Sequence, residues 1–310
     1  MLYGKYLFSS VFEDDAILPY YKGSTFRGVF GHALKKVVCA LRRQECKDCL
    51  LRKKCVYSFI FETSAAVDKP EGRKRIASPP HPYVIEPPDN IKTHYKKGES
   101  FDFPLLLFGR ANDCLPYFIY AFEQMGEIGI GRRIKGKRPA FKLNSVTADG
   151  NLVYSSEDNK IREGVFTRDL IIKNSLSEVS SLKLNLHTPL RLKFENSLHA
   201  DLPFHILVRA MLRRISSLHN YYENGEPPLD YRGLVKRAKA VEVKESSLEW
   251  FDWKRYSNRQ DRSMLMGGMI GKVNYLGELG EFVPLIKFCE KVHIGKQTSF
   301  GLGKIKITGM

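Results

Sequence analysis

An apolar, strand-like run, Leu2–Phe12, opens the chain. A turn is predicted at Pro19, and a helix is predicted from about Thr25 to Arg43. On that helix the apolar side chains recur at intervals of three and four residues, which is typical of a helix with one buried face. The residues of that face are Phe26, Phe30, Ala33, Leu34, Val37 and Leu41.

The same order of elements recurs in the second half of the chain. In Leu182–Phe194 leucines alternate with polar residues, and this period of two predicts a strand. A turn through Asp201 and Pro203 precedes a predicted helix from Phe204 to about Tyr222. Proline is favoured in the first turn of a helix, which supports this start.

Each half also ends in a similar way. In the first half, glycines and basic residues in Gly126–Arg138 precede the strand-like Phe141–Val146. In the second half, a helix through Phe282–Phe288 leads into a glycine-rich segment and a short basic strand. An order of strand, helix, strands, helix and strand, stated twice, predicts an α+β fold of two tandem ferredoxin-like (RRM-like) domains.

We expect residues 1–165 to form the first domain and residues 175–310 the second, joined through the polar segment 155–180. The proline-rich stretch Pro79–Pro88 is predicted to be a surface loop of the first domain. Asn224–Asp230 is predicted to be a loop of the second.

The charge of the chain indicates the kind of partner. Lysine and arginine number 50 against 34 acidic residues, which gives a formal net charge of +16. A chain this basic favours a polyanionic partner. Aromatic residues make up 12% and supply surfaces for stacking unpaired bases, which suits RNA more than duplex DNA. A basic protein without a nucleic-acid role is the alternative.

The sequence also argues against a membrane location. No stretch approaches the roughly 18 apolar residues that a spanning helix needs. The N-terminal residues lack a positive region followed by a long apolar core, so no signal peptide is predicted. We therefore expect a cytoplasmic, reducing location, in which six cysteines are not expected to form a disulfide framework.

Residues 295–303 carry a G-x5-G-x-G pattern, formed by Gly295, Gly301 and Gly303. Glycines let a backbone approach a phosphate closely and adopt positive φ angles. Successive loop N–H groups can then form an anion-binding nest, beside Lys296 and Lys304. In a dinucleotide-binding loop the strand comes before the loop and the helix after it, which is the opposite order. A tight turn before the last strand is the alternative to an RNA contact.

Five segments together resemble the CRISPR precursor-RNA processing endoribonucleases of the RAMP superfamily. They are Lys22–Leu34, Thr188–Lys193, Phe204–Arg214, Arg255–Gln260 and His293–Gly303. The resemblance covers nearly the whole chain and implies two ferredoxin-like domains, in agreement with the repeated pattern. It also implies metal-independent cleavage of CRISPR repeat RNA into guide RNAs, with no cofactor for catalysis. The implied partners are CRISPR repeat RNA and other CRISPR effector subunits.

Such a cleavage begins when a ribose 2′-hydroxyl attacks the adjacent phosphorus, and it leaves a 2′,3′-cyclic phosphate and a 5′-hydroxyl. A general base, a general acid and a cation assist the reaction. His32 is the best candidate for acid or base, because helical rotation puts it nearly opposite the apolar face. The neighbouring Lys35 and Lys36 are candidates for stabilising the phosphate charge. An exposed histidine without a role is the alternative.

The resemblance adds support for these assignments. It implies a histidine on this helix with a lysine nearby, and a tyrosine in the turn before the helix. Tyr20 and Tyr21 occupy that turn, and Tyr21 is the candidate to orient a group or donate a proton. Packing is the alternative role for either tyrosine.

Cys39, Cys46, Cys49 and Cys55 form a C-x6-C-x2-C-x5-C pattern. Four thiolates with a central C-x2-C pair are typical of a structural zinc site, and an iron–sulfur cluster uses the same ligands. The sequence therefore predicts a structural, non-catalytic metal centre, with four free cysteines as the alternative.

The predicted RNA contacts fall in four places and combine cationic side chains with glycine-loop backbone. They are Arg27, then Arg132, Arg133, Lys135 and Arg138, then Arg255 and Arg259, then Gly295, Lys296, Thr298, Gly301 and Gly303. Each place taken alone is also consistent with an ordinary solvated surface.

Two other functions remain open from the sequence. The first is a RAMP subunit that holds guide RNA in a CRISPR effector complex without cutting it. The second is a zinc-dependent transcription or tRNA-handling protein dominated by the cysteines, which would leave the closing glycine pattern unexplained.

Overall fold

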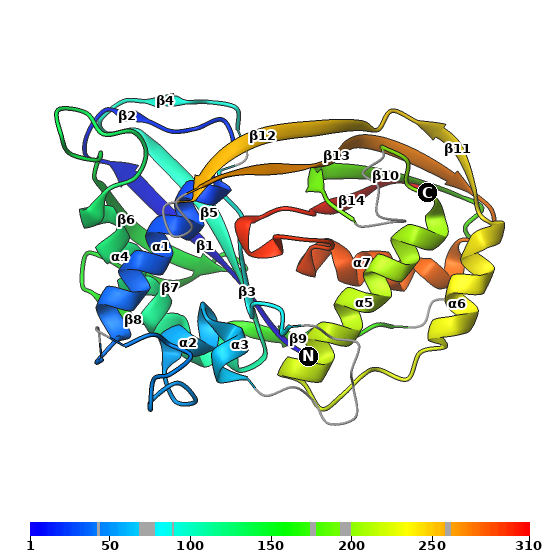
Figure 1. The fold of residues 1–310 in the computed structure, drawn as a ribbon, viewed down its shortest axis with the longest axis horizontal. Coiled ribbons are helices and arrows are strands. Elements are labelled where there is room, and N and C mark those ends of the chain that lie inside the picture. The colour runs from blue at the N-terminus through cyan, green and yellow to red at the C-terminus, as the bar shows by residue number, and fades with distance from the viewer. Residues whose placement is uncertain (42–43, 68–77, 89, 174–177, 193–199, 258–261) are drawn as a thin grey trace. The chain divides into compact units, whose positions relative to one another are not determined.

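The computed structural model describes residues 1–41, 44–67, 78–88, 90–173, 178–192, 200–257 and 262–310. The chain divides into two compact units (Figure 1). Unit 1 comprises Met1–Asp169 with Asn220–Asn224, and unit 2 comprises Leu170–His219 with Gly225–Met310.

Unit 1 is built on an antiparallel sheet whose central strands follow the order β3-β5-β1-β6. Its elements are β1 (Leu2–Phe12), β2 (Ala16–Ile17), α1 (Gly23–Val38), α2 (Val56–Ile60), α3 (Thr63–Ala66), β3 (Tyr83–Ile85), β4 (His94–Tyr95), β5 (Ser100–Phe108), α4 (Leu115–Ile128), β6 (Phe141–Ala148), β7 (Asn151–Ser155), β8 (Lys160–Ile161) and β9 (Thr167–Asp169). The first strand thus lies between the third and fourth of the βαββαβ order, as in a ferredoxin-like fold.

An aromatic core joins the sheet of unit 1 to its helices. Tyr6, Phe8, Ser10 and Phe12 are buried at alternate positions along β1. The ring of Phe8 lies 4.8 Å from that of Phe122 on α4, measured between centroids. The ring of Phe30 on α1 lies at the same distance from Phe122. Burying such large apolar surfaces is the main term that fixes α1 and α4 against the sheet.

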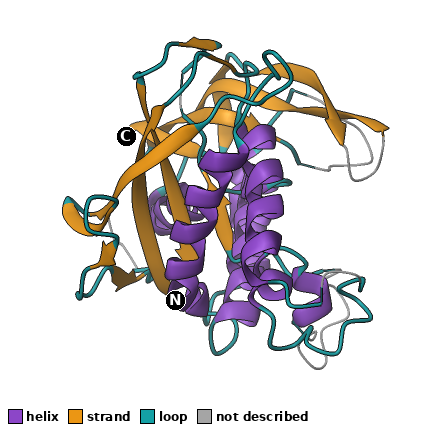
Figure 2. Ribbon diagram, turned by 90° about the vertical axis from the view of Figure 1, so that its left-hand side faces the viewer, coloured by secondary structure: helices purple, strands orange, loops and turns teal. Residues whose placement is uncertain are grey.

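Unit 2 repeats this order with β11-β13-β10-β14, and β12 also pairs with β13. Its elements are β10 (Ser181–Leu190), α5 (Phe204–Tyr222), α6 (Tyr231–Arg237), β11 (Glu242–Ser246), β12 (Glu249–Ser257), β13 (Arg262–Leu276), α7 (Val283–Val292) and β14 (Ile305–Gly309). The last residues of α5, from Asn220 on, group with unit 1. Figure 2 shows the mixture of helices and strands in the chain. The predicted α+β fold of two ferredoxin-like repeats is confirmed.

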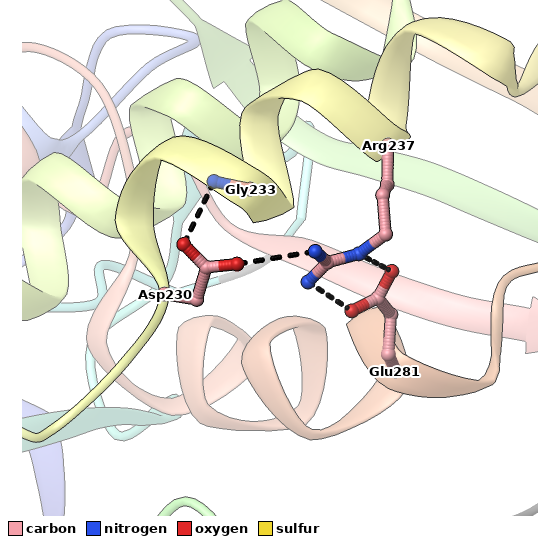
Figure 3. A network of polar contacts seen from close by, with 4 residues as sticks. All are labelled: Asp230, Gly233, Arg237 and Glu281. Atoms are coloured by element: carbon pink, nitrogen blue, oxygen red, sulfur yellow. Dashed lines mark hydrogen bonds and ion pairs between the residues drawn. The ribbon is translucent and has the colours of Figure 1, made fainter.

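A polar network fixes the short helix α6 in unit 2 (Figure 3). Asp230 caps the helix by accepting the main-chain N–H of Gly233 at 2.9 Å. The guanidinium of Arg237 donates to Asp230 at 3.1 Å and to both carboxylate oxygens of Glu281 at 2.7 and 2.8 Å. One arginine thereby joins α6 to the turn before α7.

Two local predictions differ from the structure. The helix predicted to reach Arg43 ends at Val38, where the backbone of Cys39 becomes extended. The β-branched Val37 and Val38 disfavour continued helix. Pro79–Pro88 is not wholly a loop, because β3 lies inside it and is fully buried against β5. Short edge strands flanked by proline are the kind that sheets tolerate.

The predicted strand Leu2–Phe12 and the predicted helix Phe204–Tyr222 are confirmed. Among the described residues, no helix combines the length and apolarity that crossing a membrane would need.

Candidate functional site

His32 lies on the exposed side of α1. The neighbouring residues Gly31 and Ala33 are buried, as are Phe26, Phe30 and Leu34, whereas His32 is exposed to solvent. The prediction that this histidine lies off the buried face is therefore correct. Its imidazole is free to reach a ligand, while the helix that carries it is fixed by the aromatic core.

The two lysines that follow make different contacts. Lys36 Nζ donates to Oε1 of Gln124 on α4 at 2.8 Å, at the surface. Lys35 Nζ lies 5.7 Å from the centroid of the Tyr57 ring. Both lysines occupy the last turn of α1, where cations interact favourably with the helix dipole. His32 and Lys36 stand one helical turn apart and share the exposed side of α1.

A buried lysine shapes the turn before α1. Lys22 is 1% exposed, and its Nζ donates to the carbonyls of Asn90 at 2.6 Å and Tyr20 at 3.4 Å. Tyr20 is 57% exposed and Tyr21 is half-buried. Sequence reasoning missed Lys22, although a lysine at the start of a helix is unfavourable for the dipole and calls for acceptors nearby.

The basic run forms a hairpin, here called the basic hairpin (residues 130–139). Ile130 N–H donates to Pro139 at 2.9 Å, and Ile134 and Lys137 bond to each other through their backbones. Arg132 and Arg133 are exposed on its first arm, Lys135 is exposed in the turn at its tip, and Arg138 is half-buried at its base.

The basic hairpin is fastened to the chain that leads into α1. The main-chain N–H of Arg132 donates to the carbonyl of Ile17 at 2.9 Å. Gly131 leaves no room for a side chain, because a Cβ there would collide with the same carbonyl. The structure therefore brings the predicted RNA-binding cations and the turn of Tyr20 and Tyr21 to neighbouring backbone within unit 1.

Arg27 has a packed environment within unit 1. Its guanidinium carbon lies 3.8 Å from the centroid of the Phe61 ring. Its Nη2 lies 3.3 Å from Nε2 of His81, whose Nδ1 is 2.9 Å from the hydroxyl of Thr63. Since a guanidinium can only donate, His81 accepts at Nε2 and donates from Nδ1. Arg27 is half-buried, so an RNA contact would have to use the exposed part of its side chain.

The glycine loop of unit 2, residues 293–303, is held tightly to β10. The hydroxyl of Thr188 donates to the Gly301 carbonyl and accepts from Lys304 N–H, both at 2.9 Å. Lys296 N–H donates to Arg191 at 3.1 Å. Gly303 has a φ of 75°, and a Cβ there would collide with the carbonyl of Ile294.

Within this loop, the predicted contact residues divide into two groups. Gly295 and Lys296 are exposed, whereas Thr298, Gly301 and Gly303 are buried. The exposed pair can meet a phosphate directly, and the buried three define the path of the backbone.

Of the remaining predicted contacts, Arg255 lies on β12 opposite Met264, and Arg259 lies outside the described residues.

The four cysteines lie in the connection between α1 and α2. Cys39 ends α1, Cys55 precedes α2, and Cys46 and Cys49 lie in the turns between them. All four are half-buried and free. Among the described residues, no three metal-type side chains are gathered as ready ligands.

The pKa of the Cys46 thiol depends on two of the other three cysteines. Burial raises the pKa of Cys46, and nearby Glu62, Cys39 and Cys55 raise it further, while Lys35 opposes the rise. The thiols of Cys39 and Cys55 are therefore close enough to Cys46 to influence its ionisation. Zinc binding would have to release these protons and draw the thiols together. The metal centre stays a prediction.

Two βαββαβ units, the second closed by a glycine-rich loop, define the class of double ferredoxin-like proteins. Residues 184–305 match the family of CRISPR-associated endoribonuclease Cas6. Residues 1–165 match the N-terminal domain family AF_1859_N. The chain therefore belongs to the AF_1859_N family, whose model covers just over half of it, and residues 184–305 are similar to the CRISPR-associated endoribonuclease Cas6.

The chain is also similar to individual proteins. An uncharacterised protein of Archaeoglobus fulgidus is 27% identical over 299 residues, which cover 94% of this chain and 92% of the relative. A Cas6 product complex has the same fold, with a TM-score of 0.56, 12% identity and 99% coverage of both chains. A partial Cas6-RT-Cas1–Cas2 complex also gives a TM-score of 0.56 at 13% identity, covering 99% of this chain and 46% of that one.

Proposed function

We propose that this chain cleaves CRISPR repeat RNA without a metal, by attack of a ribose 2′-hydroxyl on the adjacent phosphorus. The observation that carries the proposal is the exposure of His32 on a helix that is otherwise anchored in the aromatic core. Imidazole can accept or donate a proton near neutral pH, which is what the attack and the leaving 5′-oxygen require.

The groups around His32 suit the same reaction. Lys36, one turn away on the same face, supplies a cation for the phosphate in the transition state. Lys35 is placed at the end of the same helix and adds positive potential. Tyr21 precedes the helix in a turn that Lys22 fixes, and it is the proposed group for orienting the reacting ribose or the leaving oxygen.

RNA would be held by cations and backbone in both units. In unit 1 the basic hairpin presents Arg132, Arg133 and Lys135 beside the turn that leads into α1. In unit 2 the glycine loop presents Lys296 and the exposed backbone of Gly295. These contacts read phosphates and would give affinity without sequence specificity.

The alternative is a RAMP subunit that binds guide RNA and leaves it uncut. A relative of the same fold forms part of a Cas6-RT-Cas1–Cas2 complex. By analogy, we propose other CRISPR proteins as partners of this chain in addition to RNA. Exposure of His32 favours the cleaving enzyme, since a purely binding subunit has no need of an imidazole at this place.

The test is incubation of the purified chain with the repeat RNA from its own genome in the presence of EDTA. We expect cleavage at one site, with a 2′,3′-cyclic phosphate on one product and a 5′-hydroxyl on the other. An RNA with a single 2′-deoxy ribose upstream of the cut is the matched control and should stay intact. Binding without cleavage would support the guide-holding subunit, and cleavage of the deoxy RNA would show that water is the nucleophile.

A further inference from the structure

His293, the first residue of the glycine loop, has a backbone conformation that almost only glycine adopts. Its φ is 56° and its ψ is 156°, and it directly follows the last residue of α7. A Cβ atom makes these φ and ψ values sterically unfavourable. A residue other than glycine therefore adopts them only when contacts with its surroundings stabilise the conformation. The contacts that hold His293 are therefore the contacts that set the start of the loop.

Arg214 supplies the most direct of these contacts. This arginine of α5 is 8% exposed. Its Nε donates to the carbonyls of Val292 and His293 at 3.2 and 3.1 Å, and its Nη2 donates to Val292 at 2.8 Å. These carbonyls belong to the C-terminal end of α7, which carries partial negative charge and offsets the buried cation.

The side chain of His293 connects the first residue of the glycine loop to the end of the same loop. Its Nδ1 donates to the carbonyl of Leu302 at 3.0 Å, and the ring is fully buried. The next residue, Ile294, donates its N–H to Gly303 at 3.0 Å. The two ends of the glycine loop thus meet at one junction, formed by residues 293–294 and 302–303. Arg214 on α5 donates hydrogen bonds to this junction.

We propose that Arg214 is a positioning residue for RNA binding: it holds the junction of the glycine loop so that the exposed backbone and Lys296 are preset to receive a phosphate. The proposal rests on the proposed RNA-binding function. Arg214 is too deeply buried to contact RNA itself, so its effect must pass through the loop. A preset loop avoids the entropy cost of ordering on binding.

The neighbouring residue provides a matched control. Arg213 lies on the same helix and carries the same charge, but it is exposed. Arg214→Gln should weaken binding of the repeat RNA by about tenfold or more, because two carbonyls lose a charged donor. Arg214→Lys should recover only part of the affinity, since an ammonium cannot reproduce the planar fork on two carbonyls. Arg213→Gln should change affinity far less.

Two further measurements separate positioning from general stability. Cleavage rates over a range of RNA concentrations, well below the unfolding temperature, should show a raised KM for Arg214→Gln and a kcat close to that of the unchanged chain. Amide hydrogen exchange without RNA should be faster at residues 294–303 in Arg214→Gln and unchanged in Arg213→Gln. This exchange result does not depend on whether the chain binds or cuts RNA.

Full affinity in Arg214→Lys, or equal losses in the Arg213 and Arg214 variants, would overturn the proposal, since charge alone would then explain the effect. Unchanged exchange in the loop of Arg214→Gln would overturn it as well. The unchanged chain could fail to bind repeat RNA while amide exchange at residues 294–303 of Arg214→Gln still rises as expected. In that case the proposed function fails, but the role of Arg214 in ordering the loop is supported.

Discussion

The main-chain N–H of Arg132 donates to the carbonyl of Ile17 at 2.9 Å, and this bond fastens the basic hairpin to the chain that leads into α1. Ile17 is the last residue of β2, and α1 begins at Gly23. The side chains of Arg132 and Arg133 therefore project from a backbone that is fixed close to the start of the helix of His32. Phosphates held by these arginines would lie near the start of α1.

The first prediction concerns this hairpin. Arg132→Ala combined with Arg133→Ala should weaken RNA binding and reduce the slope of log Kd against log salt by about one to two. The loss of two phosphate contacts is the physical reason. Lys142→Ala combined with Lys160→Ala removes the same charge from exposed positions on β6 and β8, and it should leave the slope nearly unchanged. Equal slopes in the two double variants would remove the hairpin from the RNA surface.

The second prediction concerns two glycines with opposite environments. Gly303→Ala should lower thermal stability and RNA affinity, because its φ is 75° and a Cβ would collide with the Ile294 carbonyl. Gly28→Ala should raise thermal stability, because Gly28 lies within α1 and a Cβ there meets nothing within 4 Å. Thermal unfolding and RNA titration of both variants check this. Tolerance of alanine at 303 would contradict the close packing described for the loop.

The third prediction concerns pH and the network of α6. The N–H of Gly233, and then Arg237, hold the pKa of Asp230 below its usual value. A depressed pKa in the folded state adds stability above the unfolded pKa of about 3.9, and this is lost as the pH falls through the folded value. Asp230→Asn keeps a capping oxygen but loses the charge, so it should be slightly less stable than the unchanged chain at pH 7.

At pH 3 this difference should shrink as the carboxylate becomes protonated in the unchanged chain. Asp230→Ala also loses the cap and should be the less stable of the two variants at pH 7. The effect of the charge is expected to be small, because the side chains of Asp230 and Arg237 are 62% and 49% exposed. Thermal unfolding at both pH values is the measurement. A difference for Asp230→Asn that does not change with pH would show that the charge is not its cause.

The sequence predicted the repeated fold because the same order of elements recurs in both halves. Alternation of leucines with polar residues marked the strand β10, and a period of 3.6 marked the helix α1. The same period put His32 on the exposed side of α1. Such patterns show whether a side chain lies on the buried or the exposed face of its own helix or strand. The exposed or buried position of a side chain could therefore be predicted from the sequence.

Contacts between distant segments could not be predicted in this way. Nothing in the local pattern shows that Arg132 bonds to Ile17, that Arg27 stacks on Phe61, or that Lys22 is buried on Asn90. Each of these depends on how separate segments pack. Arg27 shows the consequence, because a basic residue within a recognised motif turned out to be half-buried in an aromatic and imidazole environment.

The fourth prediction concerns the four cysteines. Elemental analysis of the purified chain should find about one zinc per molecule, or iron if a cluster forms. Cys46→Ser should then lower metal content and thermal stability, because the connection between α1 and α2 would lose its crosslink. Cys114→Ser is the control, since this thiol is half-buried like the four and lies in unit 1 outside the pattern.

If the metal is structural, cleavage should persist in EDTA for as long as the chain stays folded. A metal-free chain of full stability would show that the four cysteines are simply free thiols. Loss of cleavage together with loss of metal, without loss of folding, would instead assign the metal to the reaction.

The last prediction concerns His32 as general acid or base. His32→Ala should slow cleavage by about 10²–10⁴, because one proton transfer would lose its carrier, while RNA affinity should stay within a few-fold. His94→Ala is the matched control, since His94 is also exposed and lies on β4 of the same unit. Single-turnover cleavage, with the protein in saturating excess over the RNA, separates the chemical step from binding. If the two histidine variants cut equally fast, the proton carrier lies elsewhere, and Tyr21→Phe becomes the next variant, because it removes the hydroxyl and keeps the ring.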